Sequence, residues 1–436
     1  MMEWYEALAI LLGSILALMA VGMPVALAFL AANIVGAWIF MGGERGISAL
    51  LNNGLGSLTS FALVPIPLFL LMGEIFFHTG LGARMFNAID RLLGRLPGRL
   101  SYVTVLGGTG FSTLSGSSMG ATALLGSLMV PEMTRRGYKK HMSIGPILGT
   151  GGLAIIIPPS ALAVLLATLA RIDVGALLIA GIIPGLILSM FYIGTIWLQC
   201  RIDPSAAPAY DVEEMRLGEK LALFFRDVIP MLSVMVVIVF MMVVGIVTPS
   251  EAAAFGALGV LLLAVLFRCL TWEAVKKSVV GALRVTLMAY LIVFGSATFS
   301  QLLAFSGASR GLITWATGFD LDPLMMLMVM FGVLLLLGMF MEQISMMLLT
   351  VPIFFPLAQS LGFDLVWFAL IMLLALEISF TTPPFGLLLF VMKGVAPPDT
   401  TMRDIYLSAF PFMGCSLLLV VLLVAFPQLA LWLPGL

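Results

Sequence analysis

Two short stretches, far apart in the chain, decide how it folds. Residues 157–160 read Ile-Pro-Pro-Ser and residues 381–386 read Thr-Thr-Pro-Pro-Phe-Gly, each next to long apolar runs. Proline lacks a backbone N–H and clashes with the preceding helical turn, so two adjacent prolines interrupt a helix. The segments 142–168 and 365–396 are therefore predicted to be helices that break near their middle. A plain kink is the alternative, although one proline would suffice for it.

The composition around these breaks points to a membrane protein. Of 436 residues, 61% are hydrophobic and 10% are charged, and the mean hydropathy is +1.17. Soluble domains carry about 25% charged residues, whereas apolar segments long enough for a hydrocarbon core of about 30 Å recur along this whole chain. The net charge of −1 gives no indication of nucleic-acid binding. Three cysteines and two histidines lack metal-binding spacing, so we expect structural cysteines and no His-based metal site.

Two further apolar segments are interrupted in a different way. Residues 100–131 and 323–358 are divided by polar or glycine-rich stretches at 114–120 and 341–345. The halves of the first are too short to span the membrane comfortably, and basic residues flank both of its ends. Both segments are therefore predicted to be re-entrant hairpins, which enter and leave the membrane on the same side.

The landmarks recur in the same order in both halves of the chain. Pro24 and Pro249 are 225 residues apart, as are Pro158 and Pro383. Each half then has about five spans and one hairpin, and because five is odd, the second half must be inverted. We expect an all-α polytopic membrane protein with two inverted-topology repeats. The predicted domains are a first repeat at 1–200, a cytoplasmic connector at 201–227 and a second repeat at 228–436.

Basic residues give the orientation. One side of this topology collects 18 of the 21 lysines and arginines, which leaves Arg45, Arg171 and Arg310 on the other. The positive-inside rule makes the basic side cytoplasmic. Both termini are then periplasmic, the first hairpin enters from the cytoplasm, and the second enters from outside. The acidic N-terminus is unlike a signal peptide, so the first apolar segment is expected to be retained.

Paired broken helices near the bilayer midplane indicate the binding site of a secondary transporter. Non-helical backbone at that depth is tolerated only where it is buried in protein or lines a water-filled cavity. Half-helix N-termini attract anions, and freed carbonyl groups suit a hard cation such as Na⁺. The alternative is that small residues here only allow close helix packing. The predicted substrate-binding residues are Ser115, Gly116, Ser117, Ser118, Thr122, Ser160, Glu342 and Ser345.

Two sodium sites are predicted, one at each pairing of a hairpin tip with a break. The first lies between the tip at 115–118 and the break after Ile157, and the second between the tip at 338–345 and the Thr-Thr-Pro-Pro stretch. The predicted ligands are Ser115, Ser117, Ser118, Gly149, Gly152, Pro158, Gly338, Glu342, Thr381, Thr382 and Pro383.

Acidic residues inside membrane spans are expensive and often functional. For Glu342, orienting the hairpin tip and binding a cation are both open, and Glu74 and Glu377 have no assigned role. Glu251 is expected to cap a helix, since it follows Thr248 by three residues. No lysine or arginine is predicted at the midplane, so an anionic solute would need helix N-termini, hydroxyls and bound cations. No catalytic motif is present, and an intramembrane enzyme or a channel is less favoured than a transporter.

Taken together, several motifs resemble those of the large membrane (M) subunit of tripartite ATP-independent periplasmic (TRAP) transporters, the DctM-like family. They lie at 22–24, 65–73, 115–118, 152–160, 248–254 and 382–386, and the resemblance covers essentially the full chain. It implies a sodium-coupled, elevator-type permease of the ion transporter superfamily, in the bacterial inner membrane. It also implies a small organic anion as solute, a soluble periplasmic substrate-binding protein, and a separate small four-helix membrane subunit. A stand-alone sodium- or proton-coupled symporter is the alternative.

Overall fold

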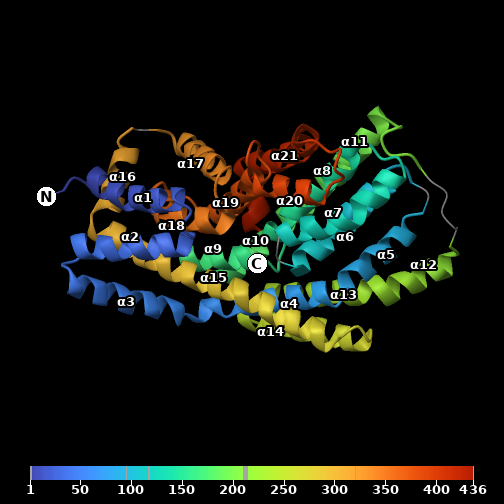
Figure 1. Ribbon diagram of the computed structural model, residues 1–436, viewed down its shortest axis with the longest axis horizontal. Coiled ribbons are helices and arrows are strands. Elements are labelled where there is room, and N and C mark those ends of the chain that lie inside the picture. The colour runs from blue at the N-terminus through green and yellow to red at the C-terminus, as the bar shows by residue number, and fades with distance from the viewer. Residues whose placement is uncertain (1, 95, 116–117, 210–214, 320, 436) are drawn as a thin grey trace.

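Figure 1 shows the computed structural model, which describes residues 2–94, 96–115, 118–209, 215–319 and 321–435. Every regular element in these ranges is a helix. The first half contains α1 (Trp4–Ala20), α2 (Val25–Phe40), α3 (Glu44–Leu58), η1 (Phe61–Leu63), α4 (Pro65–His78), α5 (Leu81–Leu92), α6 (Arg99–Ser115), α7 (Ser118–Arg135), α8 (Lys140–Ile156), α9 (Ala161–Ala170), α10 (Val174–Ala180) and α11 (Ile182–Ile202). The second contains α12 (Leu217–Leu223), η2 (Phe224–Val228), α13 (Ile229–Val243), α14 (Pro249–Leu266), α15 (Trp272–Phe305), α16 (Ala308–Thr317), α17 (Pro323–Gly338), α18 (Gln343–Ser360), α19 (Leu365–Phe380), α20 (Leu387–Val395), α21 (Met402–Ala425) and α22 (Gln428–Leu431).

Many of these helices are apolar enough to cross a membrane. In the described part of the chain, seven helical segments have the required length and hydropathy, and the bent pair α8–α9 would make eight. Four shorter apolar helices, α1, α2, α17 and α19, accompany them. The protein is therefore an all-helical, multi-span membrane protein.

Two helices that are buried along nearly their whole length lie at the centre. Every residue of α8 from Met142 to Ile156 is buried, and so is every residue of α19 from Trp367 to Phe380. Around them, α13, α14 and α15 expose many large apolar side chains, and these helices run along one edge of the molecule in Figure 1. Such a surface suits contact with lipid, because hydrocarbon tails accept apolar side chains without cost.

Two helix pairs fold back on themselves beside this centre. In α6 and α7, a Cβ added to Gly108 would lie 3.1 Å from Leu125, so the middles of the two helices meet. In α17 and α18, a Cβ on Gly338 would lie 3.3 Å from the Met346 methyl group. Each pair therefore forms a helical hairpin, and Ser118 and Gln343, at the beginnings of α7 and α18, are buried. We call the beginning of α7 with Ser118 and Met119 the first tip, and residues 338–344 the second tip.

Both double-proline stretches lie outside the helices. α8 ends at Ile156 and α9 begins at Ala161, with a bend of 44° between them. α19 ends at Phe380 and α20 begins at Leu387. Each interval contains one cis peptide bond, Pro158–Pro159 in the first and Pro383–Pro384 in the second.

The connector contains more helix than its polar composition indicates. Its second part forms α12, which continues through the π-helical turn η2 into α13. Its first part is tied to the turn between α7 and α8, where the Lys139 ammonium group lies 2.5 Å from Asp203. This hydrogen bond lowers the pKa of the Asp203 carboxyl to about 2. The same turn donates the Lys139 amide to the Ala206 carbonyl at 2.8 Å.

Candidate functional site

A cavity of about 280 Å³ lies where the two tips meet the two breaks. The first tip contributes Ser118 and Met119, and the second contributes Glu342, Gln343 and Ile344. The residues that follow the first break and precede the second complete this part of the lining: Ala161, Leu162, Leu165 and Phe380. The remaining wall comes from α4 and α15, through Ile66, Leu70, Glu74, Val285, Met288 and Ala289. Segments from across the chain thus converge on one small volume.

Unpartnered polar atoms surround the cavity. The Ser118 hydroxyl and the Gln343 side-chain amide nitrogen are buried and have no hydrogen-bond partner among the described residues. The Thr122 hydroxyl, one turn further along α7, is also buried and unpartnered, but it lies against Gly151 of α8 and does not line the cavity. Buried polar groups without partners cost about 1–3 kcal/mol each. Ser118 and Gln343, at the beginnings of α7 and α18, are the two that line the cavity, and a polar ligand there would complete their hydrogen bonds.

The first tip lies directly on α8. A Cβ added to Gly151 would overlap the Thr122 hydroxyl, so only glycine allows the tip to approach this closely. The next glycine, Gly152, faces the Glu377 carboxyl of α19 instead. Gly149 packs against the Phe412 ring at 2.8 Å from an added Cβ and does not line the cavity. The two predicted ligands on α8, Gly149 and Gly152, thus face different neighbours, and neither lines the cavity.

The second tip lies directly on α19. A Cβ on Gly338 would overlap the Ser379 side chain, which brings the end of α17 against the last turn of α19. Glu342 occupies the N-cap position of α18 and lines the cavity. Ser345 is buried in the first turn of α18 but is not part of the cavity lining.

The side-chain hydroxyl groups of the predicted residues at the breaks already make local hydrogen bonds. Ser160 is fully buried and caps α9 by accepting the Ala163 amide at 3.2 Å. The Thr381 and Thr382 hydroxyls donate to the Ile378 carbonyl at 3.0 and 2.7 Å. Pro158 and Pro383 lie within the breaks, where proline has no N–H to donate. Of the other predicted residues, Gly116 and Ser117 lie outside the described residues, as does the side chain of Ser115.

The ionisable side chains on the cavity wall are acidic. Glu74 and Glu342 both line it, and the lining contains no lysine or arginine. His78, one turn further along α4, lies 3.1 Å from the Glu74 carboxyl group. No group of three or more histidine, cysteine, aspartate or glutamate side chains that could hold a metal ion occurs among the described residues. Any cation here would be held by scattered carboxylate, hydroxyl and backbone oxygens, the ligands of a hard ion.

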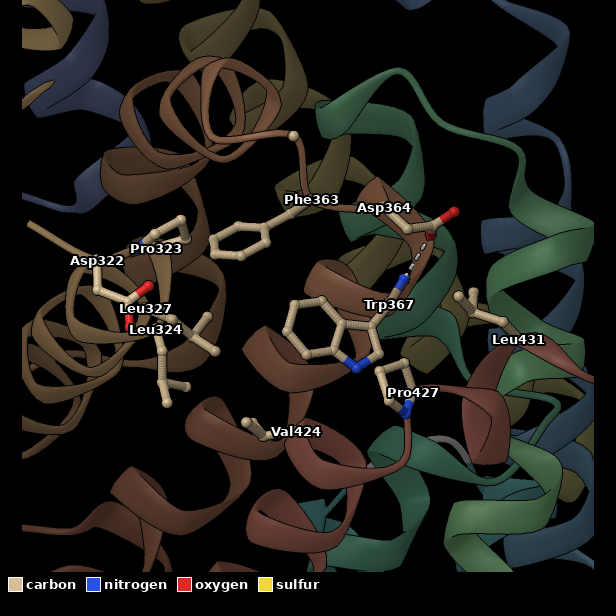
Figure 2. A pocket seen from close by; sticks show the side chains of 11 residues that line it. Asp322, Pro323, Leu324, Leu327, Phe363, Asp364, Trp367, Val424, Pro427 and Leu431 are labelled. Carbon is tan, nitrogen blue, oxygen red and sulfur yellow. Dashed lines mark hydrogen bonds between the residues drawn. The ribbon is translucent and has the colours of Figure 1, made fainter.

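A larger cavity, of about 460 Å³, has different properties (Figure 2). It lies among the beginnings of α17 and α19 and the ends of α21 and α22, and its lining is mostly apolar. The Asp364 carboxylate in it caps α19 by accepting the Val366 and Trp367 amides at 2.9 and 3.0 Å. The Trp367 indole donates to the Leu423 carbonyl at 2.8 Å. Because Asp364 and Trp367 are already paired and the rest of the lining is mostly apolar, the smaller central cavity is the better candidate for solute binding.

Sequence reasoning did not single out several residues that the structure brings to the centre. Gln343 and Phe380 line the cavity, and Tyr192 and Ser416 hydrogen-bond the buried Glu377 carboxylate. Gln343 adjoins the predicted Glu342 and could have been included on that ground. Tyr192 and Ser416 come from separate helices with no local motif, so the sequence held no signal for them.

Comparison with known proteins gives the family. Residues 12–429 match the protein family described as "Tripartite ATP-independent periplasmic transporter, DctM component". The chain belongs to this DctM family. This DctM-family protein is therefore a transporter permease and not an enzyme, and a tripartite system supplies it with partner components.

Relatives and one solved structure extend the comparison. The chain is 32% identical to the C4-dicarboxylate TRAP transporter large permease protein DctM of Pseudomonas aeruginosa, over 86% of each. It is 27% identical to the isethionate TRAP transporter permease protein DctMQ of Oleidesulfovibrio alaskensis, over 99% of this chain and 67% of that protein. The fold of this DctM-family permease resembles that of the YdaH transporter of Alcanivorax borkumensis, with a TM-score of 0.63 and 13% identity. That match covers 89% of this chain and 91% of the other.

Proposed function

We propose that this protein is the permease of a sodium-coupled, binding-protein-dependent secondary transporter that imports a small organic anion. The observation that carries the proposal is the cavity between the two tips, with its unpartnered polar atoms and two carboxylates. Carboxylates repel an anion at close range. An anion therefore enters such a site only together with cations, and co-bound sodium ions supply that charge.

The predicted sodium sites fit the pairing of tips and breaks. Ser118 lies where α7 begins against α8, and Glu342 lies where α18 begins close to the end of α19. Each place combines side-chain oxygens with the freed carbonyls of a broken helix, which are the ligands that Na⁺ uses in transporters. We place one sodium ion at each, with the solute in the cavity between them.

The solute class rests on the relatives. A C4-dicarboxylate is named for one and isethionate for another. Both are small acids, and a cavity of about 280 Å³ is of the right order for a solute of that size. We therefore assign a small carboxylate or related acid as the solute.

The proposed assembly has further parts. The two halves are inverted repeats, 1–200 and 228–436, and the tips with their broken helices form the core that moves as an elevator. A periplasmic binding protein delivers the solute to the outer face. A separate four-helix subunit completes the membrane complex, and the description of the family as tripartite supports a further component of this kind.

Uptake into proteoliposomes tests this function. Permease, small subunit and binding protein are reconstituted together, and uptake of labelled dicarboxylates is measured with and without an inward sodium gradient. We expect uptake only with sodium and with the binding protein. Uptake that follows a proton gradient in sodium-free buffer would refute sodium coupling. Equal uptake without the binding protein would favour a stand-alone symporter.

A matched pair of variants on α7 localises the site. Ser118→Ala removes an unpartnered hydroxyl at the cavity, and we expect the sodium concentration for half-maximal uptake to rise several-fold. Ser127→Ala removes an exposed hydroxyl on the same helix, which only bonds the Leu124 carbonyl of its own turn, and should change nothing. Equal sodium dependence in both variants would remove Ser118 from the site.

A thiol probe tests the orientation. Ser205 is exposed in the connector beside Asp203, so a Ser205→Cys variant presents an accessible thiol. With the natural cysteines removed, an impermeant maleimide should label this thiol in inside-out vesicles and leave it unlabelled in intact cells. Labelling in intact cells would overturn the cytoplasmic connector and the periplasmic termini.

A further inference from the structure

A second polar cavity, of about 270 Å³, lies among α3, α9, α15 and α18. α15 packs against the other three helices, which are its neighbours in Figure 1. The cavity is lined by one arginine and several hydroxyl groups: Ser57, Ser60, Thr168, Arg171, Ser296 and Ser300. No aspartate or glutamate lines it, in contrast to the central cavity. We call it the outer cavity, because the distribution of basic residues predicts that Arg171 is periplasmic.

Three of these hydroxyl groups are available to a ligand. Serine in a membrane helix commonly donates to the carbonyl group one turn earlier, as Ser278 of α15 does to Ala274 at 2.7 Å. Ser296 and Ser300 of the same helix make no such bond, and the Ser60 hydroxyl also has no partner among the described residues. Ser296 is buried as well. Hydroxyl groups in such positions hydrogen-bond a ligand or ordered water.

Arg171 supplies the positive charge of the outer cavity. It makes no ion pair with any described residue. Asp173, the next acidic residue in the chain, caps α10 by accepting the Ala176 amide at 2.6 Å. Arg171 ends α9 in the left-handed conformation, with φ +56°, where glycine is the common residue. The arginine side chain is therefore present here at a conformational cost that glycine would avoid.

The outer cavity and the central cavity are neighbours along the same two helices. α9 contributes Leu165 to the central cavity and Leu169 to the outer one. α15 contributes Ala289 to the central cavity and Val293 to the outer one. Each step is about one helical turn, or about 6 Å along the helix axis. A solute in the outer cavity would therefore be one turn away from the central cavity.

From these observations we infer that the outer cavity is a second anion-binding site, in which Arg171 and the three unpartnered hydroxyl groups hold the carboxylate of a small organic acid. A guanidinium group pairs with a carboxylate through two parallel N–H donors. Because Arg171 supplies the positive charge, this site needs no sodium ion. Its place along α9 and α15 makes it the site that the solute occupies before the central cavity. This entry role rests on the proposed function, whereas anion binding by itself does not.

Binding of labelled succinate in sodium-free choline buffer tests the inference. The full-length permease and its small subunit are placed in lipid nanodiscs, and binding is measured by equilibrium dialysis. The proposed central site lacks its cations in this buffer, so the outer cavity should be the only site that binds. We expect saturable binding that weakens as ionic strength rises and that uncharged succinamide does not displace. Absence of saturable binding would overturn the inference.

Two arginine variants assign this binding to the outer cavity. Arg171→Gly removes the side chain and suits the left-handed backbone, so the variant should fold at least as well as the unchanged protein. Its affinity for succinate should fall tenfold or more. Arg45→Ala is the matched control, because Arg45 is exposed, is predicted on the same side and does not line the cavity. Equal affinity in Arg171→Gly and the unchanged protein, or an equal loss in both variants, would overturn the site.

A pair of serine variants on α15 tests the hydroxyl groups independently of the arginine. Ser296→Ala removes an unpartnered hydroxyl, and the affinity for succinate in sodium-free buffer should fall several-fold. Ser278→Ala removes a hydroxyl that bonds only within its own helix, and the affinity should not change. The same affinity in both variants would remove the serines from the site and overturn the inference as stated.

Ser118→Ala, at the central cavity, separates this inference from the proposed function. Sodium-free binding that Ser118→Ala weakens and Arg171→Gly does not would place the anion in the central cavity and overturn the outer site. Sodium-free binding that depends on Arg171 and not on Ser118 would support the outer site, whether uptake then follows sodium or protons.

Discussion

The two broken helices use the same kind of break in opposite surroundings. Around the first, residues 157–160 are all buried, and the Ser160 hydroxyl caps the helix that follows. Around the second, Pro384 and Phe385 are exposed, and no side chain caps α20 at Gly386. The first break is thus enclosed by protein, and the second opens onto the surface.

The helices before the breaks differ as well. α8 carries Gly149, Gly151 and Gly152, whereas the positions 225 residues later on α19 hold Leu374, Leu376 and Glu377. The glycines of α8 receive side chains from other helices, and α19 supplies one of those side chains, Glu377. Similar breaks therefore follow helices with different packing roles. The glycines of α8 leave room for neighbouring side chains, and Glu377 of α19 occupies part of that room.

The largest effect is expected at the contact between these helices. Gly152→Ala places a methyl group on the Glu377 carboxyl, and such overpacking of a buried site costs about 1–3 kcal/mol. The variant should melt at clearly lower temperature in a detergent thermal-shift measurement. Gly194→Ala on α11 is the control, because nothing lies within 4 Å of an added Cβ there, and it should be neutral or stabilising. Equal melting temperatures would show that α8 and α19 are not in tight contact.

A smaller effect should separate the two breaks. Ser160→Ala removes the α9 cap and should cost about 1 kcal/mol of stability. Thr382→Ala removes a hydroxyl that only bonds within its own helix end, so stability should hardly change while the sodium dependence of uptake weakens. Melting curves and sodium titrations on both variants measure this difference. If Thr382→Ala destabilised the protein as much as Ser160→Ala, the contrast between the breaks would fail.

The smallest effect concerns the aromatic pair on the open side. The Phe340 ring of the second tip lies 5.5 Å from the Phe385 ring of the second break, and both are largely exposed. Phe385→Leu should cost about 0.5 kcal/mol, the low end for an aromatic pair. Phe390→Leu, at an exposed ring on α20 without a ring partner among the described residues, is the control. A double-mutant cycle with Phe340→Leu measures the pair; zero coupling would mean that tip and break do not touch.

The membrane character and the positions of the helix ends near the prolines follow from local chemistry. Pro158 and Pro383 lack a backbone N–H in any context, so each removes a hydrogen bond from a helix. A content of 61% hydrophobic residues is far from that of a soluble protein. The membership of the DctM family could also be predicted, because its motifs are short and contiguous. These features need no knowledge of which segments meet in space.

The features that sequence reasoning missed depend on tertiary contacts. α3 is short and amphipathic, and it packs against α15. The Phe294 ring of α15 lies directly on Gly54 of α3. Tyr192 meets Glu377 across 185 residues of chain. Gly149 of α8 packs against the Phe412 ring of α21, a contact across more than half of the chain. No local pattern encodes such pairings, because each depends on which helix faces which.

The length of α15 ties this protein to the thickness of its membrane. Its 34 residues extend about 51 Å, well beyond a hydrocarbon core of about 30 Å. Its first two turns carry Lys276 and Lys277, which suit the headgroup region, and the helix packs against α2, α3, α4 and α18. A helix longer than the core must tilt or protrude, and hydrophobic mismatch sets the balance. A thinner bilayer would increase the tilt of α15 relative to the membrane normal, and the helices packed against it would tilt with it.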